Sequence, residues 1–231
     1  MCGRFTQHYT WHDLEALFDL GGPPRNLQPH YNIAPTDTVD AVVAGDGGRA
    51  LVPMRWGLVP LWWKKSLREL PATFNARAET VAEKPMFRDA FARRRCIIPA
   101  SGYYEWLKTP SGRDPYYISA AAGGVLSFAG LWDTWIDPKT SAAMRSCTVI
   151  VTAANALTRA VHDRMPALLE PADVAAWLGG AGTSLLRPAA EDRLRMWPVS
   201  RRVNRAGAGD DDPTLVQEAV HGPLAGAPPL V

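Results

Sequence analysis

The sequence contains little cysteine, which limits the kinds of site that it can build. Cys2, Cys96 and Cys147 are the only cysteines among 231 residues, and no two of them are close together. A disulfide framework needs paired cysteines, and a structural zinc site needs clustered Cys or His ligands. His8 and His12 are four residues apart, but two imidazoles without further ligands do not make a zinc site. We therefore expect no disulfide, no metal and no other cofactor, and a chain suited to a reducing cytosol.

Long apolar runs are also missing. The best candidate, residues 120–129, is too short to cross a bilayer and contains glycine. The first residues show no charged stretch followed by an apolar one, so we expect no secretory signal. Apolar residues make up 47% and charged residues 21%, the balance of a soluble globular protein. These absences argue against a membrane protein and favour a cytoplasmic location.

Strong net charge is a third absence. A net charge of +2 is too small to indicate a nucleic-acid-binding protein by itself. However, nine tryptophans accompany basic clusters such as residues 64–65, 93–95 and 201–202. Basic side chains interleaved with aromatic rings are typical of surfaces that bind single strands, although each tryptophan alone is more often a core residue. The run Arg93–Arg95 is either solvated surface or part of such a track.

Short strands separated by turns dominate the pattern. Thr10 is expected to cap a helix ending at Phe18, and Pro85 suits the first turn of a helix over residues 83–93. The turn residues 45–48 predict a hairpin between residues 39–44 and 50–58. Further strands are expected over residues 96–99, 102–107, 116–120, 125–132 and 146–152, and short helices over 156–161 and 172–178.

These elements predict the α+β class. We expect a single domain over residues 1–206, with a mainly antiparallel, bent or barrel-like sheet and a few peripheral helices. Residues 207–231 are rich in Gly, Asp and Pro, which predicts a loose C-terminal tail.

The second residue is the first candidate for chemistry. Because cysteine is small, Met1 would normally be trimmed, and Cys2 would then carry an amine and a thiol on adjacent carbons. Such a 1,2-aminothiol condenses with an aldehyde to a Schiff base and closes to a five-membered thiazolidine. The amine titrates near pH ~8 and the thiol near ~8.5, so both are partly available at neutral pH. A cysteine in second place also occurs by chance, so this motif alone does not decide the function.

Three further segments each contain one candidate residue. Asn75 follows an extended stretch, Glu105 lies among aromatic residues, and His162 follows a short predicted helix. Each has a structural alternative: Asn75 as a turn cap, Glu105 as the partner of an arginine, and His162 as a half-buried core histidine. Read one at a time, the structural alternatives are favoured.

Together these segments resemble the SRAP family of SOS-response-associated peptidases, or abasic-site-processing proteins. The resemblance covers nearly the whole chain, in the family's order. Besides the segments above it rests on residues 1–5, 31–35, 56–60, Trp62-Trp63, Arg77 with Glu79, and residues 197–200.

The resemblance implies a DNA-damage enzyme with lyase-like crosslinking activity. It implies a cytoplasmic, nucleoid-associated monomer that senses abasic sites in single-stranded DNA during repair and the SOS response, with replication proteins as further partners. Cys2 would form the thiazolidine crosslink that shields the lesion, and Asn75 would orient it. Glu105 and His162 would move protons, since a carboxyl among aromatic residues has a raised pKa and histidine titrates near neutrality.

The resemblance also implies a set of DNA-binding side chains. Arginines suit phosphates, and tryptophans suit stacking on bases or a wedge between strands. The set comprises Arg4, Asn32, Pro35, Trp62, Trp63, Arg77 and Arg164.

Two other interpretations stay open. The protein could read modified or single-stranded DNA without a covalent bond, with its aromatic residues as a cage. It could also be a peptidase in which Cys2 acts as an N-terminal nucleophile that releases its own leader. The leader here would be a single Met, for which ordinary trimming suffices.

Overall fold

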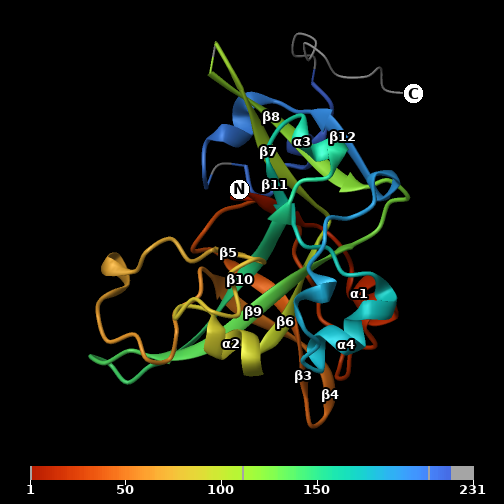
Figure 1. Cartoon of the computed structure of the whole chain (residues 1–231). Helices are drawn as coiled ribbons and strands as arrows, with labels where there is room; N and C mark the ends of the chain where they lie inside the picture. The colour runs from red at the N-terminus through yellow and green to blue at the C-terminus, as the bar shows by residue number, and fades with distance from the viewer. Residues whose placement is uncertain (1, 111, 208, 220–231) are drawn as a thin grey trace.

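Two β-sheets form the body of the protein, which a computed structural model describes over residues 2–110, 112–207 and 209–219. One sheet has five strands, and every pair in it is antiparallel. It forms the upper part of the molecule in Figure 1. Its strands, in spatial order, are β12 (Leu194–Pro198), β8 (Gly112–Ala120), β7 (Gly102–Thr109), β1 (Phe5–Gln7) and β2 (His30–Ile33).

The second sheet closes into a barrel, which forms the lower part of the molecule in Figure 1. Its spatial order is β10 (Ala143–Ala153), β4 (Gly48–Trp56), β3 (Thr38–Gly45), β6 (Arg95–Ala100) and β9 (Leu126–Ile136). The β9–β10 pairing, from Ala143↔Ile136 to Val149↔Gly130, completes the ring. Strand β10 also pairs with β5 (Asn75–Arg77) in parallel and with β11 (Arg164–Pro166) in antiparallel fashion.

The barrel strands are buried on both faces. On β6, Cys96 and Ile98 belong to the inner core, whereas Ile97 packs in the outer cluster. The outer cluster lies beneath the helices α1 (Trp11–Phe18), α2 (Arg88–Arg93) and α4 (Val174–Leu178). Strands buried on two faces show continuous apolar runs rather than alternation, and the sequence has such runs here. The expected α+β class, with a mainly antiparallel barrel-like sheet and few peripheral helices, is confirmed.

The first two predictions of local structure are correct. Thr10 caps α1 through a capping box with Asp13. The β3–β4 hairpin turns through Asp46 and Gly47, with Gly45 paired to Gly48.

The predicted helix over residues 83–93 is wrong in length, because α2 begins only at Arg88. Residues 79–87 form turns and bends, and Phe87 has φ −126° and ψ −26°, outside the helical region. Phe87 is 6% exposed and belongs to the outer cluster. Burial of its ring against the barrel therefore outweighs the helix propensity of the residues before it.

The basic run Arg93–Arg95 is divided between different environments. Arg95 is buried between the rings of Phe91 and Trp177, 4.1 and 4.3 Å from their centroids. Arg94 pairs with Asp133. Only Arg93 is exposed, so the run does not form a continuous basic track.

The expected C-terminal tail starts at residue 207. Residues 209–219 lie against the five-stranded sheet: Trp197 Nε1 donates to Val216 O (2.8 Å), and Val199 forms a bridge with Glu218. Residues 220–231 of that tail lie outside the described residues. None of the helices in residues 2–110, 112–207 and 209–219 has the length and apolar character of a membrane span.

Candidate active site

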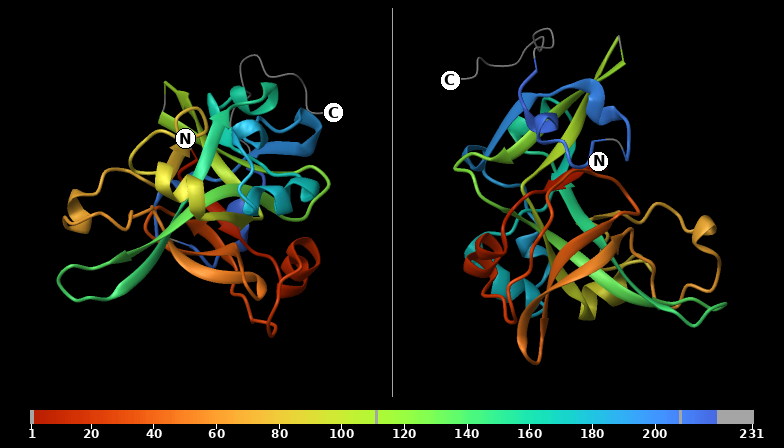
Figure 2. Two further views of the ribbon diagram at one scale, coloured as in Figure 1. Left: turned by 60° about the horizontal axis from the view of Figure 1, so that its bottom comes forward. Right: turned by 180° about the vertical axis from the view of Figure 1, so that it is seen from behind.

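The N-terminal strand carries Cys2 into the place where the two sheets meet. Strand β1 lies between β7 and β2, with Phe5 opposite both Tyr103 and Ile33. It is the red strand at the waist of the molecule in Figure 1, and the rear view of Figure 2 shows the same position. Cys2 is fully buried and belongs to the inner core together with Met165. The first candidate residue for chemistry therefore lies in the interior of the protein.

Asn75 holds the backbone of Cys2. It begins β5, where it pairs with Val149 of β10. Its Nδ2 donates a 2.7 Å hydrogen bond to the carbonyl oxygen of Cys2. Its Oδ1 is buried and accepts no hydrogen bond from any described residue. Asn75 thus holds the Cys2 backbone through its Nδ2 group, and its Oδ1 is an acceptor inside the site.

Glu105 supplies a buried carboxyl. It lies on β7 opposite Tyr116 and is 3% exposed. Strand alternation places it on the face of Tyr103, which packs with Cys2, while Tyr104 packs in the cluster on the opposite face. Burial raises the pKa of Glu105 to about 7. Near neutral pH this carboxyl can therefore give or accept a proton.

His162 enters from the turn between α3 (Ala156–Arg159) and β11. Its Nδ1 lies 3.0 Å from the backbone nitrogen of Arg164 and 2.9 Å from a carboxylate oxygen of Asp163. Burial lowers the pKa of His162, and Asp163 opposes this shift. The imidazole is therefore mainly neutral at pH 7 and able to accept a proton.

These groups share one electrostatic environment. Burial raises the pKa of the Cys2 thiol far above its usual range, and the charge of Glu105 raises it further. Asp163 acts on the pKa of both Glu105 and His162. The structure thus brings Asn75, Glu105 and His162 together with Cys2, whose buried thiol keeps its proton at neutral pH.

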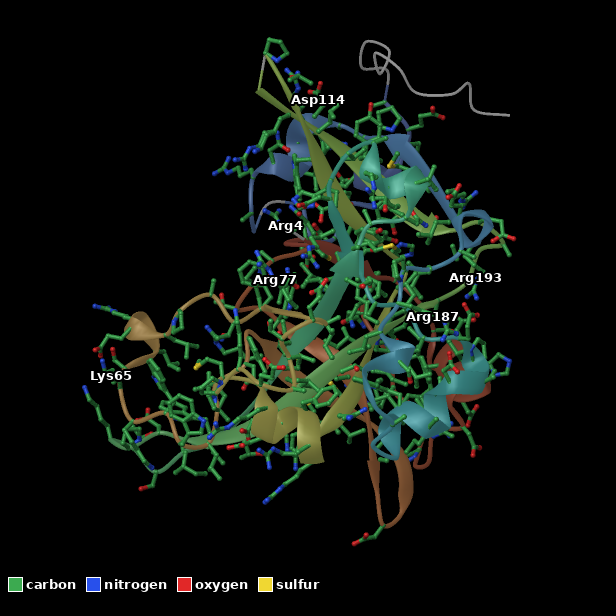
Figure 3. All side chains as sticks on the ribbon, in the orientation of Figure 1. Arg4, Lys65, Arg77, Asp114, Arg187 and Arg193 are labelled. Atoms are coloured by element: carbon green, nitrogen blue, oxygen red, sulfur yellow. The ribbon has the colours of Figure 1, made fainter. Side chains whose placement is uncertain are left out.

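Two arginines expected to bind DNA lie beside this site. Arg77 follows Asn75 by two residues on β5 and is exposed. Arg164 begins β11, and its guanidinium pairs with Glu79. Figure 3 shows Arg77 and Arg4 at the waist between the two sheets. Arg77 is therefore an exposed cation two residues after the side chain that holds Cys2. Both Arg77 and Arg164 lower the pKa of Glu79, the residue that Arg164 also contacts directly.

Arg4 and Asn32 are buried, whereas side chains that contact DNA are expected to be exposed. Arg4 is 9% exposed, and its Nη1 donates to Asn32 Oδ1 (2.6 Å) and to Val203 O (3.0 Å). Asn32 is 1% exposed, and its Nδ2 donates to Arg205 O. Pro35 is half-buried. Buried groups bonded in this way hold elements together, and a phosphate contact by Arg4 or Asn32 stays a prediction.

Trp62 and Trp63 lie on a separate loop, between β4 and β5. The loop projects from the barrel on the same side as the β9–β10 hairpin in Figures 1 and 2. Trp62 is 44% exposed, and its ring centroid is 6.0 Å from that of Trp63. Trp135 Nε1 donates to Trp63 O (2.7 Å), which ties the loop to the hairpin. The exposed ring of Trp62 is available for stacking on a base.

Two residues at the site are outside the predicted set. Asp163 contacts His162 directly, and its place next to a histidine in the sequence is a signal for such a pair. Tyr103 is fully buried. Burial raises the pKa of its hydroxyl well above the usual range, and the charges of Cys2 and Glu105 raise it further. Its hydroxyl has no hydrogen-bond partner among the described residues. The two-residue period of β7 already places Tyr103 beside Glu105, so this signal was available in the sequence.

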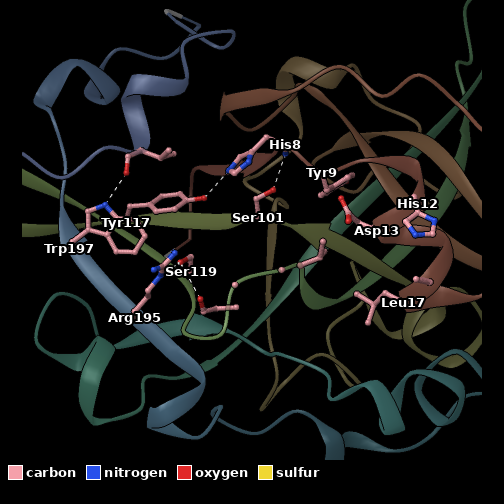
Figure 4. A pocket seen from close by; sticks show the side chains of 16 residues that line it. His8, Tyr9, His12, Asp13, Leu17, Ser101, Tyr117, Ser119, Arg195 and Trp197 are labelled. Atoms are coloured by element: carbon pink, nitrogen blue, oxygen red, sulfur yellow. Dashed lines mark hydrogen bonds between the residues drawn. The ribbon is translucent and has the colours of Figure 1, made fainter. Parts of the chain in front are cut away.

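A groove of about 880 Å³ lies elsewhere, between α1 and the outer strands β8 and β12 (Figure 4). None of the predicted catalytic residues is among the described residues that line it. His8 and Tyr117 meet there through a 3.3 Å contact, and Arg195 lies over Trp197. The chemistry of the candidate active site is therefore not located in this groove.

Comparisons with known proteins show the family and the fold of the chain. Residues 1–206 match the family described as SOS response associated peptidase (SRAP). The abasic site processing protein YoqW of Bacillus subtilis is 34% identical over 226 residues, covering 94% of this chain and 99% of that protein. The abasic site processing protein YedK of Escherichia coli is 32% identical over 184 residues, covering 77% and 79%. A crystal structure of a Bacteroides thetaiotaomicron protein superposes with a TM-score of 0.85 at 26% identity, covering 95% and 100%.

The raised pKa of Glu105 predicts a pH-dependent effect on stability. Its carboxyl is more acidic in the unfolded chain, so folding is penalised as pH rises from about 4.5 to about 7. Glu105→Gln removes this penalty. Relative to wild type it should gain unfolding free energy on the order of 2–3 kcal/mol between pH 4.5 and pH 8. Urea denaturation of both proteins across this range measures the difference. Parallel curves would show that Glu105 titrates normally.

Proposed function

Because the chain belongs to the SRAP family, we propose that it processes abasic sites in DNA by a covalent route. Once Met1 is removed, the amine and thiol of Cys2 trap the ring-opened sugar as a thiazolidine, which shields the lesion. One observation carries this proposal: Cys2 is buried, with its carbonyl held by Asn75 and with a carboxyl of pKa about 7 acting on its thiol. The family match and the names of the relatives support abasic sites as the substrate.

Formation of the thiazolidine needs only the amine and thiol of Cys2 and the sugar aldehyde. The amine of Cys2 attacks the C1′ aldehyde of the open deoxyribose, and loss of one water gives the Schiff base. The thiol then loses its proton and its sulfur bonds to the same carbon, while the nitrogen takes up a proton. The product is a five-membered ring that contains both heteroatoms, and one water is released overall.

Glu105 and His162 move the protons of these steps. Protonated Glu105 gives its proton to the sugar ring oxygen as the aldehyde is unmasked, and the ionised form accepts the proton of the thiol. His162, kept mainly neutral by burial, accepts a proton at the Schiff-base stage. Asn75 keeps the Cys2 backbone in place, so that the amine and thiol meet the same carbon.

The strand is bound by charge and stacking, and single-stranded DNA suits these contacts best. Arg77 is an exposed cation beside Cys2, and Arg164 joins it when a phosphate competes with Glu79. Trp62 and Trp63 offer rings for unstacked bases. Pro35, which is half-buried, is a further proposed contact on the basis of the family motif over residues 31–35. We place the protein in the DNA damage response, as a cytoplasmic, nucleoid-associated monomer.

A non-covalent reader of modified DNA is the second candidate. Exposed aromatic and basic residues suit it equally well, but it gives no role to a buried Cys2 whose backbone is held by Asn75. A self-processing peptidase is less suited, because the relatives are named for abasic site processing.

Cys2→Ala separates the covalent route from the reader. The variant should form no stable adduct with single-stranded abasic DNA, because the ring needs the sulfur. Its strand affinity should stay close to that of wild type, because phosphate contacts provide it. Intact-mass and peptide mass spectrometry detect the adduct on the N-terminal peptide. Cys2→Ser serves as the control: it should reach only a Schiff base, which borohydride traps. A heat-stable adduct on the Cys2→Ala protein would exclude the thiazolidine.

Glu105→Gln tests proton transfer. It keeps the shape of the side chain but cannot cycle a proton, so formation of the crosslink should slow by ~10²–10⁴. Reversal of a preformed crosslink should slow as well, because a catalyst acts in both directions. Single-turnover time courses of both reactions at several pH values measure this. The wild-type rate should change near pH 7 and the variant's should not. Equal rates for the two proteins would leave Glu105 only a structural role.

Arg77→Ala tests the binding surface. Loss of one phosphate contact should weaken binding to strands of any sequence and reduce the slope of log affinity against log salt by about one. Arg93→Ala is the matched control, since Arg93 is also exposed but lies on α2 of the barrel. Fluorescence anisotropy with labelled strands from low to high salt gives both slopes. Equal losses of affinity in the two variants would show that Arg77 is not part of the DNA-binding surface.

A further inference from the structure

We propose that residues 209–219, which we call the strap, act through Asp210 to position strand β1 and the residues just before it, Cys2 among them. The strap lies beyond residue 206, where the match to the family ends. Asp210 would act as a positioning residue: it touches neither Cys2 nor Glu105 but sets the place of the strand that carries Cys2. The kinetic part of this inference rests on the proposed function.

The strap is attached to the outer face of the five-stranded sheet. Arg202 anchors its first half, with Nη1 donating to Asp212 Oδ2 (2.7 Å) and Nη2 to Thr214 Oγ1 (2.6 Å). Leu215 is buried. Ala219 N donates to Pro198 O (2.9 Å) at the other end. These contacts fix the backbone of the strap at both ends, so that its other residues can hold the strand beside them in place.

Asp210 binds strand β2, which is an edge strand of this sheet. Tyr31 N donates to Asp210 O (2.7 Å), and Asn32 N donates to Asp210 Oδ1 (2.9 Å). The other carboxylate oxygen pairs with His30 Nδ1. One residue of the strap therefore binds three consecutive residues of an edge strand whose outer backbone groups would otherwise lack a strand partner.

Asn32 connects Asp210 to Arg4, the residue just before strand β1. Its Oδ1 accepts from Arg4 Nη1 (2.6 Å), and the same nitrogen donates to Val203 O (3.0 Å). Arg4 stands two residues after Cys2, and its carbonyl oxygen accepts from Tyr104 N (2.9 Å). The Cys2 sulfur lies 4.0 Å from that same carbonyl oxygen. The connection thus runs from Asp210 through Asn32 and Arg4 to Cys2 and to the strand that bears Glu105.

The buried state of Arg4 follows from this connection. An arginine that is 9% exposed needs acceptors, and it finds them on Asn32 and on the backbone just before the strap. Loss of Asp210 would leave the backbone nitrogen of Asn32 without its acceptor and would loosen the amide that holds Arg4. The consequence is a small displacement of Cys2 relative to Glu105, which affects reaction rate more than DNA affinity.

The chain offers a matched control next to Asp210. Asp211 is exposed, and its side chain makes no hydrogen bond or ion pair with a described residue. Asp210→Ala and Asp211→Ala remove the same charge one residue apart, so any general electrostatic effect on DNA binding is common to both. Asp210→Asn keeps an acceptor for Asn32 N and serves as the conservative rescue.

Single-turnover crosslinking over a range of abasic-strand concentrations tests the kinetic part, with full-length proteins below their melting temperatures. Asp210→Ala should lower the maximal rate by about tenfold relative to Asp211→Ala, with the half-saturating concentration unchanged within about twofold. Asp210→Asn should recover most of the rate. Equal maximal rates for the two alanine variants, or a change in half-saturation alone, would overturn the proposal.

Hydrogen exchange without DNA tests the positioning independently of any crosslink. The Tyr104 amide, which donates to Arg4 O, should exchange about tenfold faster in Asp210→Ala than in Asp211→Ala. Unchanged exchange there would overturn the strap's role, whatever the chemistry of the site. A wild-type protein that forms no crosslink would instead contradict the proposed function and leave this measurement valid.

Discussion

The burial of the N-terminal strand between β7 and β2 is the constraint on which the site depends. A chain end is usually loose unless a sheet or a packed element holds it. Here three residues of β1 join the sheet on both sides, and Phe5 and Cys2 enter the core between the two sheets. Because Cys2 precedes a strand with two partners, its backbone has one position, and Asn75 can bond to it.

Burial then determines the electrostatics of the site. Removing Cys2 and Glu105 from water raises the pKa of both, so the thiol is kept protonated while the carboxyl titrates near neutrality. The two effects complement each other: a thiol that keeps its proton shares the site with a carboxyl that can accept one. His162, held mainly neutral by burial and bonded within its own turn, adds a second acceptor nearby.

The family match ends at residue 206, but the structural support of the site does not. Arg4 is held by Asn32 and by the backbone of Val203, and Asn32 is bonded to Asp210 beyond that boundary. A short motif around Cys2 therefore depends on residues about two hundred positions away in the chain. The same contacts explain why Arg4 and Asn32, which appear in the sequence as polar DNA-binding candidates, are buried.

The sequence by itself determined much of the local structure and the set of candidate site residues. The capping box at Thr10, the hairpin turn at Asp46-Gly47 and the alternation around Glu105 each depend on a few neighbouring residues, so they could be predicted. The β9–β10 pairing that completes the expected barrel, the shortened helix before Arg93 and the burial of Arg4 could not. They depend on contacts between distant segments, where burial of Phe87 outweighs helix propensity and a remote carboxylate holds an edge strand. Tertiary structure alone decided these features, because their energies come from partners that no local pattern contains.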